Sequence, residues 1–200
     1  MSRAPRLSKS GIEYLTHIWS FYSGCENQMR GICSVPNCWA RSITERFPAH
    51  YPNGFNPTFY FDAFLSPMSL KKPSRIGVAF MGDLFGDWID PEAKIPVALY
   101  GLDQKSIGLA KVGINLVPQF PLRKAIYNTI KCCPQHTFLF LTKCPQNLLV
   151  WSPFPPNCFV GVSVTRNNQL ENALKYLKQI EATVKFISFE PLLERINLDI

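Results

Sequence analysis

The stretch RIGVAFMGD, Arg75–Asp83, is an apolar run that ends in a glycine and an acidic residue. Apolar runs of this length are typical of strands that are buried on both faces, as in parallel sheets. Three further stretches share this character: Thr137–Lys143 (TFLFLTK), Cys158–Val164 (CFVGVSV) and Val184–Leu193 (VKFISFEPLL). We therefore predict a parallel sheet at the centre of the fold.

Segments with helical periodicity lie between these strands. Two of them gather apolar side chains on one face: Pro121–Cys133, with Ala125, Ile126, Ile130 and Cys133, and Asn168–Ala182, with Leu170, Leu174, Leu177 and Ile180. Further helices are expected at Cys38–Phe47 and at Asp90–Leu102, and further strands at His17–Ser23 and Thr58–Phe64. Strands that alternate with helices in this way predict a parallel α/β fold, either a barrel or a doubly wound sheet.

The composition of the 200-residue chain supports a folded protein. Its hydrophobic fraction of 46% and aromatic fraction of 13% suffice for a core, which excludes a disordered chain. We expect a basic N-terminal tail at 1–13 and a single domain at 14–200, with an inserted loop at 102–120. The net charge of +7 suits a nucleic acid or nucleotide partner, but scattered Lys and Arg residues equally suit general solubility.

Neither export nor membrane insertion is predicted. The N-terminal MSRAPRLSKSG lacks the apolar core of a secretory signal, and no apolar run reaches the ~18 residues of a membrane span. We expect a cytoplasmic protein without a membrane partner, whose seven cysteines stay reduced. The sequence leaves the oligomeric state open.

Polar residues stand where the expected strands end. These are Asp83, Lys143, Ser163 and Glu190. Because active sites of parallel barrels and open α/β sheets lie at the carboxyl ends of the strands, we expect the four side chains at one rim. Each of them alone is also explained as a loop residue that water satisfies.

Three cysteines follow the first expected strand, so they belong to the same rim. Cys25, Cys33 and Cys38 lie in GCENQMRGICSVPNCWA, Gly24–Ala40, and three thiols cannot all pair with one another. Thiolates ligate iron–sulfur clusters, and a cubane with three protein ligands keeps one iron open. Three unmodified thiols in one such loop would be open to oxidation without a benefit.

Zinc is the alternative metal. Structural zinc takes four protein ligands, and catalytic zinc keeps one position open. A fourth donor beside the three cysteines would come from His17, Glu26 or Cys144. The remaining cysteines are expected to be ordinary thiols.

Five stretches together carry a resemblance to a known family: SGC…GIC…NCWAR, FMGDLFGDWI, PQHTFLFLTKCPQNL, NCFVGVSV and FISFEPLL. In this order, over roughly Tyr14 to Leu193, they resemble the phage- and prophage-associated three-cysteine-motif family of uncharacterised proteins. That family is usually placed with the radical S-adenosylmethionine (SAM)-like barrels. The resemblance implies a partial (β/α) TIM-like barrel of about six βα units. It also implies phage association, which leaves room for a partner protein encoded nearby.

The site that the resemblance implies is a [4Fe–4S] cluster on Cys25, Cys33 and Cys38, with SAM on the open iron. Reduction would cleave SAM to methionine and a 5′-deoxyadenosyl radical, which removes a hydrogen atom from the substrate. Two residues are assigned catalytic roles: Lys143 and Glu190. Three are assigned to cofactor binding: Asp83, Ser163 and Glu190. Lys143 and Ser163 are also suited to a carboxylate or a phosphate.

Two features depart from the radical-SAM pattern. Seven residues separate the first two cysteines and four the last two, where the pattern is CxxxCxxC. The chain also ends at RINLDI, just beyond FEPLL, so we expect either a short member or a fragment. Two further functions stay open: a zinc-bearing nucleic-acid-binding protein, and a phage structural component that uses a metal site as a staple.

Overall fold

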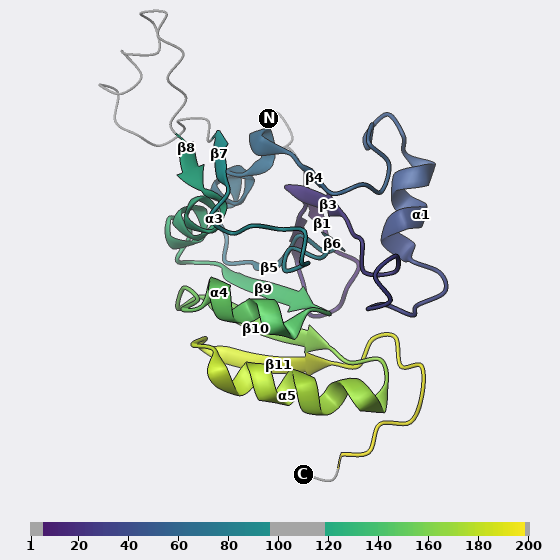
Figure 1. Cartoon of the computed structure of the whole chain (residues 1–200). Coiled ribbons are helices and arrows are strands. Elements are labelled where there is room, and N and C mark those ends of the chain that lie inside the picture. Colours follow the sequence, from purple (N-terminus) through teal and green to yellow (C-terminus); the bar gives the residue numbers. More distant parts are fainter. Residues whose placement is uncertain (1–5, 97–118, 199–200) are drawn as a thin grey trace, which may run out of the picture.

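The core of the protein is a six-stranded sheet, seen in a computed structural model that describes residues 6–96 and 119–198 (Figure 1). The strands are, in spatial order, β1 (Leu7–Lys9), β2 (His17–Trp19), β5 (Arg75–Val78), β9 (Thr137–Thr142), β10 (Cys158–Ser163) and β11 (Val184–Ser188). Edge strand β1 is antiparallel to β2, and the other five strands are parallel. The structure is thus mixed α/β, and within its described part the sheet does not close into a barrel.

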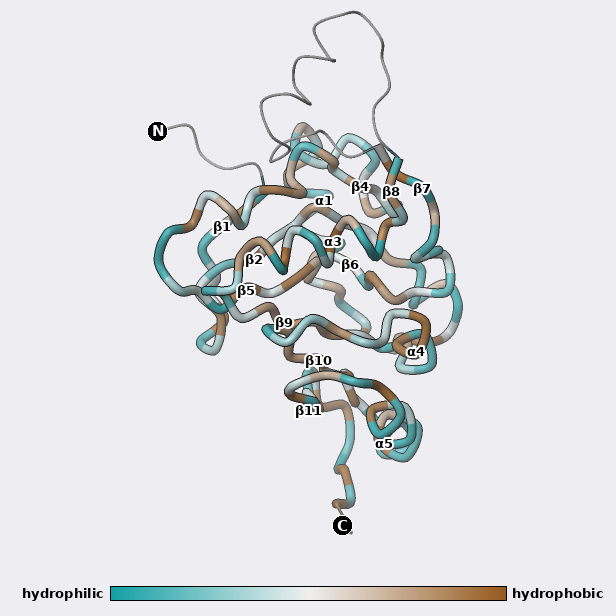
Figure 2. The backbone as a smooth tube through the Cα atoms, turned by 90° about the vertical axis from the view of Figure 1, so that its left-hand side faces the viewer, coloured by the Kyte–Doolittle hydropathy of each residue, from teal (hydrophilic) through white to brown (hydrophobic). Residues whose placement is uncertain are grey.

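The five parallel strands follow one another in chain order, without the reversal that marks a doubly wound sheet. Right-handed crossovers then bring the connecting helices to the same face. The helices after β5, β9 and β10 are α3 (Leu122–Lys131), α4 (Leu148–Trp151) and α5 (Leu170–Gln179). Figure 1 shows α4 and α5 in front of the sheet, and Figure 2, which views the strands end-on, shows both helices on one side.

The two faces of the sheet differ in burial. One face is fully buried and packs with the three helices in the main core: Trp19, Ile76, Phe138, Phe140, Val160, Ile126, Leu148 and Ala173. Because side chains alternate along a strand, their neighbours point the other way. Leu139 among those neighbours is buried, but four others are only half-buried: Ile18, Leu141, Phe159 and Phe186. The second face is therefore free to form the wall of a site.

The paired strands β2 and β5 break and continue as β3 (Tyr22–Gly24) and β6 (Met81–Gly82), which form a second sheet with β4 (Thr58–Phe59). Trp19 pairs with Val78 and Ser23 with Met81, so three residues on one strand oppose two on the other. This is the count of a β-bulge, a feature common beside active sites. Ala79, in the bulge, has a φ of +58°. The bulge redirects both strands just before Cys25 and Asp83.

Most of the expected elements are confirmed with small shifts. Helix α1 spans Trp39–Arg46, and α3, α5, β9 and β10 fall within their expected ranges. Of the predicted apolar stripe on α5, Leu177 and Ile180 are buried, whereas Leu174 is 37% exposed. Short 3-10 turns complete the described structure: η1 (Phe61–Ala63), η2 (Ser66–Ser69), η3 (Pro145–Asn147) and η4 (Asn167–Gln169).

Two expected elements are wrong in their described parts. Thr58–Phe64 is a strand only at β4, because the chain turns into η1 to bury Ala63 and Phe64. The segment from Asp90 is not helical up to residue 96. There the Asp90 carboxylate accepts the Glu92 N–H at 2.9 Å and closes a turn into β7 (Lys94–Pro96). Residues 97–102 lie outside the described part.

The expected tail and inserted loop have mixed outcomes. Residues 7–9 form β1, with a buried Leu7, so they belong to the sheet rather than to a tail. The expected loop at 102–120 lies outside the described residues except for its end, which begins β8 (Gln119–Pro121), the antiparallel partner of β7. Helices long and apolar enough to cross a membrane are absent from the part of the chain that the structure describes.

Candidate site at the carboxyl ends of the parallel strands

A cavity of about 690 Å³ opens at the carboxyl ends of the parallel strands. In Figure 1 the arrowheads of β9, β10 and β11 point toward the side where α1 and the segment leading into it lie. The three cysteines and the four polar residues expected at the strand ends all line this cavity: Cys25, Cys33, Cys38, Asp83, Lys143, Ser163 and Glu190. The half-buried sheet face contributes Ile18 and Leu141 to the lining. The fold thus brings the predicted residues together, while their roles stay predictions.

Asp83 is the centre of a buried hydrogen-bond network. Its side chain is 4% exposed. One carboxylate oxygen accepts the Thr142 hydroxyl at 2.7 Å and the Phe85 N–H at 3.1 Å. The other accepts the Asn27 amide at 2.8 Å and the Lys143 N–H at 2.9 Å. A carboxylate has about four acceptor sites, so Asp83 is saturated and holds the cavity wall together rather than offering a free ligand atom.

Asn27 connects the segment 25–38, which we call the cysteine loop, to this network. Its backbone N–H donates to the Cys25 sulfur at 3.4 Å, and its carbonyl accepts the Cys33 N–H at 3.0 Å. Its side chain donates to Asp83 and accepts the Cys144 thiol at 3.2 Å. The backbone of Asn27 therefore holds two of the three cysteines, while its side-chain amide attaches the loop to the sheet. Asn27 could not be predicted as a site residue, because an asparagine in a loop belongs to no periodic pattern.

Two glycines let the strands approach closely just before the site. A Cβ on Gly82 would lie 2.2 Å from the Gly24 carbonyl oxygen, and one on Gly24 would lie 2.4 Å from the Asn56 backbone. Gly24 also has a φ of +93°, which side chains rarely adopt. Since Cys25 and Asp83 follow these glycines directly, the contact places both residues side by side.

The three candidate ligands are partly buried free thiols. Burial raises the pKa of the Cys25 thiol to about 12, with smaller contributions from Asp83 and from the neighbouring Cys33 and Cys38. Within residues 6–96 and 119–198, no three His, Cys, Asp or Glu side chains are grouped closely enough to hold a metal ion. The thiols therefore share one cavity without forming a closed coordination group.

None of the three residues considered as a fourth ligand lines the cavity. His17 lies at the amino end of β2, away from the cysteine loop, and contacts the Thr16 hydroxyl at 3.0 Å. Cys144 is fully buried behind Asn27, does not line the cavity, and has a pKa raised by burial. Glu26 pairs with Arg30, with 2.6 Å between the closest nitrogen and oxygen.

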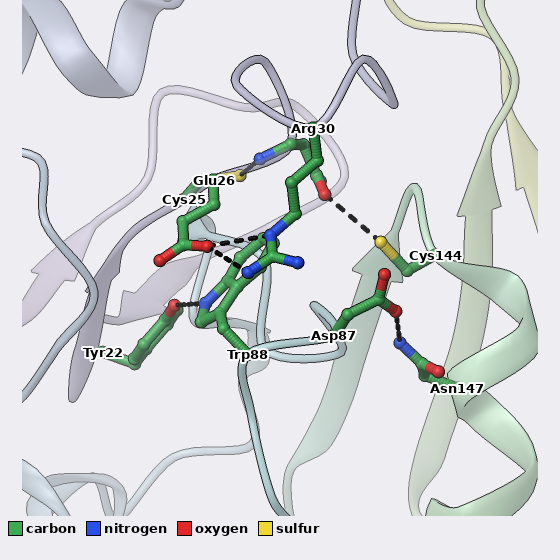
Figure 3. Close-up of polar contacts among 9 residues, drawn as sticks. Tyr22, Cys25, Glu26, Arg30, Asp87, Trp88, Cys144 and Asn147 are labelled. Atoms are coloured by element: carbon green, nitrogen blue, oxygen red, sulfur yellow. Dashed lines mark hydrogen bonds and ion pairs between the residues drawn. The ribbon is translucent and has the colours of Figure 1, made fainter.

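Figure 3 shows this ion pair of the cysteine loop next to Trp88. The Arg30 guanidinium lies 5.5 Å from the centre of the Trp88 ring, and the Trp88 indole N–H donates to the Tyr22 hydroxyl at 2.8 Å. Nearby, the Asn147 amide donates to Asp87 at 2.7 Å. The contact between Arg30 and Trp88 joins the loop to the segment after β6, and none of Arg30, Trp88 and Asp87 lines the cavity.

Lys143, Ser163 and Glu190 reach the cavity from the ends of three neighbouring strands. The Lys143 ammonium has no hydrogen-bond or ion-pair partner among the described residues, although its backbone N–H binds Asp83. Ser163 is 4% exposed, and its hydroxyl likewise has no partner in the described part. Glu190 is exposed, and its charge adds to the effect of burial in raising the pKa of Tyr14.

Comparison with known proteins finds a similarity for the C-terminal part only. Residues 114–200, less than half of the chain, match the model of a family described as a protein of unknown function, DUF5131. No curated protein and no solved structure matches the chain. The matched segment contains Lys143, Ser163 and Glu190 but begins beyond the cysteine loop, so it bears on the sheet rather than on the thiols.

Proposed function

We propose that the chain is a radical-SAM-type enzyme that holds a [4Fe–4S] cluster on Cys25, Cys33 and Cys38. The observation that carries the proposal is the shared cavity: the three thiols line it with Lys143 and Glu190, at the carboxyl ends of parallel strands. The chain order of those strands supports a partial barrel with the site at its mouth. The phage association implied by the sequence resemblance belongs to the same proposal.

The donor set fits a cluster with one open iron better than it fits a four-coordinate structural zinc. Three thiols face the cavity, whereas Cys144 is held behind Asn27 and Glu26 is paired with Arg30. Structural zinc requires four protein ligands, while a cubane on three cysteines keeps one site for an exogenous ligand. Binding requires that the thiols lose their protons and that the loop draws together around the cluster.

The surrounding residues give the site its shape and charge. Cys38 directly precedes α1, and the positive end of a helix dipole favours the negative charge of a thiolate-bound cluster. Asp83 and Asn27 act as positioning residues, because their polar atoms are already used in fixing the loop. The charged and hydroxyl groups of SAM or substrate would bind to the remaining polar residues of the cavity: Lys143, Ser163 and Glu190. A bound cluster would supply the electron that cleaves SAM.

Anaerobic reconstitution with iron and sulfide tests the proposal. We expect a brown protein that absorbs near 400 nm, and loss of iron and sulfide in Cys33→Ala. Cys132→Ser is the matched control, because Cys132 is exposed and does not line the cavity. Reduction in the presence of SAM should release methionine and 5′-deoxyadenosine.

Three results would contradict the assignment. Equal iron in Cys33→Ala and Cys132→Ser would remove the loop as the cluster site. A colourless protein that holds stoichiometric zinc instead of iron would favour the zinc-bearing alternative. Iron binding without SAM cleavage would leave a cluster protein that lacks the proposed chemistry.

A further inference from the structure

A second, smaller pocket lies next to the cavity and has a different character. Its volume is about 290 Å³, and it lies between the cysteine loop, the ends of β9 and β10 and the start of α5. Its lining is mainly polar and includes Ser34, Lys143, Ser163, Arg166, Asn168 and Gln169. Two of these residues, Lys143 and Ser163, also line the larger cavity, so the two spaces adjoin.

We propose that this pocket binds a phosphate group of the substrate, whose remaining part lies in the larger cavity. The first observation is the charge of the lining: Lys143 and Arg166 contribute cations, and no acidic residue lines the pocket. The second is Ser163, a residue that is 4% exposed and whose hydroxyl lines the pocket without a partner in the described residues. This hydroxyl can therefore donate to a ligand that enters the pocket or accept from it.

Of the two cations, Arg166 is paired with a carboxylate and, among the described residues, Lys143 is not. Glu194 pairs with Arg166 at 3.2 Å and accepts the Asn167 N–H at 2.7 Å. Arg166 also donates its Nε–H to the Ser34 hydroxyl at 3.1 Å, but a guanidinium has five N–H donors. Asp83 meets only the backbone of Lys143, so the ammonium stays free. Lys143 therefore supplies the principal unpaired charge.

The donors and the size of the pocket suit phosphate. A phosphate presents several strong acceptors, which match an ammonium, a guanidinium, hydroxyls and side-chain amides. A volume of 290 Å³ also leaves space for water molecules, each of which takes about 30 Å³ in the liquid. The larger cavity next to it has aromatic walls: Tyr14, Trp39, Phe55 and Phe80. A nucleotide, either free or part of a single strand, has both an aromatic base for the larger cavity and a phosphate for the smaller pocket.

This inference rests on the proposed function only where it places the reacting part of the substrate near the cysteines. Phosphate binding itself involves Lys143, which directly follows β9, and Ser163, which ends β10; neither belongs to the cysteine loop. The two proposals can therefore fail separately. Cys33→Ala should lose iron and still bind phosphate.

The test is calorimetric titration of the full chain with inorganic phosphate, a nucleoside monophosphate and a short single-stranded oligonucleotide. We expect binding that Lys143→Met weakens about ten- to a hundredfold, because a charged hydrogen bond is lost. Ser163→Ala should weaken it less. Lys178→Met, which removes an exposed charge from the other end of α5, should bind like the parent protein.

The probes also distinguish the source of the phosphate. Equal affinity for the monophosphate and the oligonucleotide indicates a free nucleotide, whereas tighter oligonucleotide binding that falls steeply with salt indicates a nucleic acid. Both results support the pocket. The proposal is overturned if none of the probes binds at millimolar concentration, or if Lys143→Met and Ser163→Ala bind as the parent protein does.

Discussion

At the scale of single residues, Asp83 lies where the sequence predicts a site residue but has a structural role. It was selected from the sequence as a cofactor ligand because it ends a buried strand, and it does line the cavity. Its four hydrogen bonds, however, come from the chain itself and join the cysteine loop to the end of β9. A saturated carboxylate of this kind stabilises the fold around a site.

The substitution Asp83→Asn tests this role. An amide group replaces one acceptor oxygen by a donor, so two of the four N–H and O–H groups lose their partner inside the protein. We expect the free energy of unfolding to fall by about 2–3 kcal/mol, measured by urea denaturation. Asp87→Asn is the matched control, because Asp87 is exposed, and it should change stability by less than about 0.5 kcal/mol. Equal effects of the two variants would contradict the buried network.

Residue positions were predictable from the sequence where strand geometry determines them. The ends of parallel strands meet at one rim, so Asp83, Lys143, Ser163 and Glu190 could be expected at one place before their partners were known. Asn27 and Arg166 could not. Both lie in irregular segments, and their roles depend on contacts with residues far along the chain.

At the scale of elements, the same contrast holds between periodic and irregular segments. Helices α3 and α5 and strands β9 and β10 could be predicted because burial of one face imposes a period on the sequence. The Asp90–Pro91 pair was misleading, since the same two residues begin a helix or a turn. In the structure the Asp90 carboxylate caps a turn that leads into β7. The bulge between β2 and β3 could not be predicted from the sequence either, because it depends on the register between two strands.

The close contact of β3 and β6 leads to a prediction for Gly82→Ala. The added Cβ would lie 2.2 Å from the Gly24 carbonyl oxygen, so the two strands must separate. We expect a loss of stability of about 1–3 kcal/mol and reduced iron incorporation, because Cys25 and Asp83 move apart. Denaturation and iron analysis of the same preparation measure both effects.

Gly11→Ala is the control for this substitution. Nothing lies within 4 Å of a Cβ at Gly11, although this glycine also lines the cavity. Its stability should therefore stay within about 0.5 kcal/mol of the parent protein. A Gly82→Ala variant that matches Gly11→Ala in both stability and iron would show that the strands do not need their close approach.

At the scale of the whole molecule, the half-buried face of the sheet explains why a site forms here. Parallel sheets are usually covered on both faces, yet Ile18 and Leu141 on this face border an open cavity. The bulge and the cysteine loop close the carboxyl end of that space, and the smaller pocket extends it toward α5. The fold therefore provides an apolar chamber with charged groups at its rim, which suits a ligand with an aromatic and an anionic part.

The distribution of buried thiols across the molecule predicts how stability depends on pH. Burial raises the pKa of Cys25 and Cys158 to about 12 and that of Cys133 to about 11, against an ordinary value near 9. Above pH 9 the unfolded chain releases these protons while the folded chain keeps them. The unfolded state then binds fewer protons, so the free energy of unfolding falls as the pH rises, until the folded thiols also titrate.

We therefore expect urea midpoints, measured under reducing conditions, to be level between pH 7 and about 8.5 and to decrease steadily above pH 9. The variant Cys158→Ala removes one of the titrating groups from the core. It should be less stable at pH 7 because of the cavity it leaves, but its stability should decline less steeply above pH 9 than that of the parent protein. A level profile in the parent protein up to pH 10, or an unchanged slope in Cys158→Ala, would contradict the buried neutral thiols on which the argument rests.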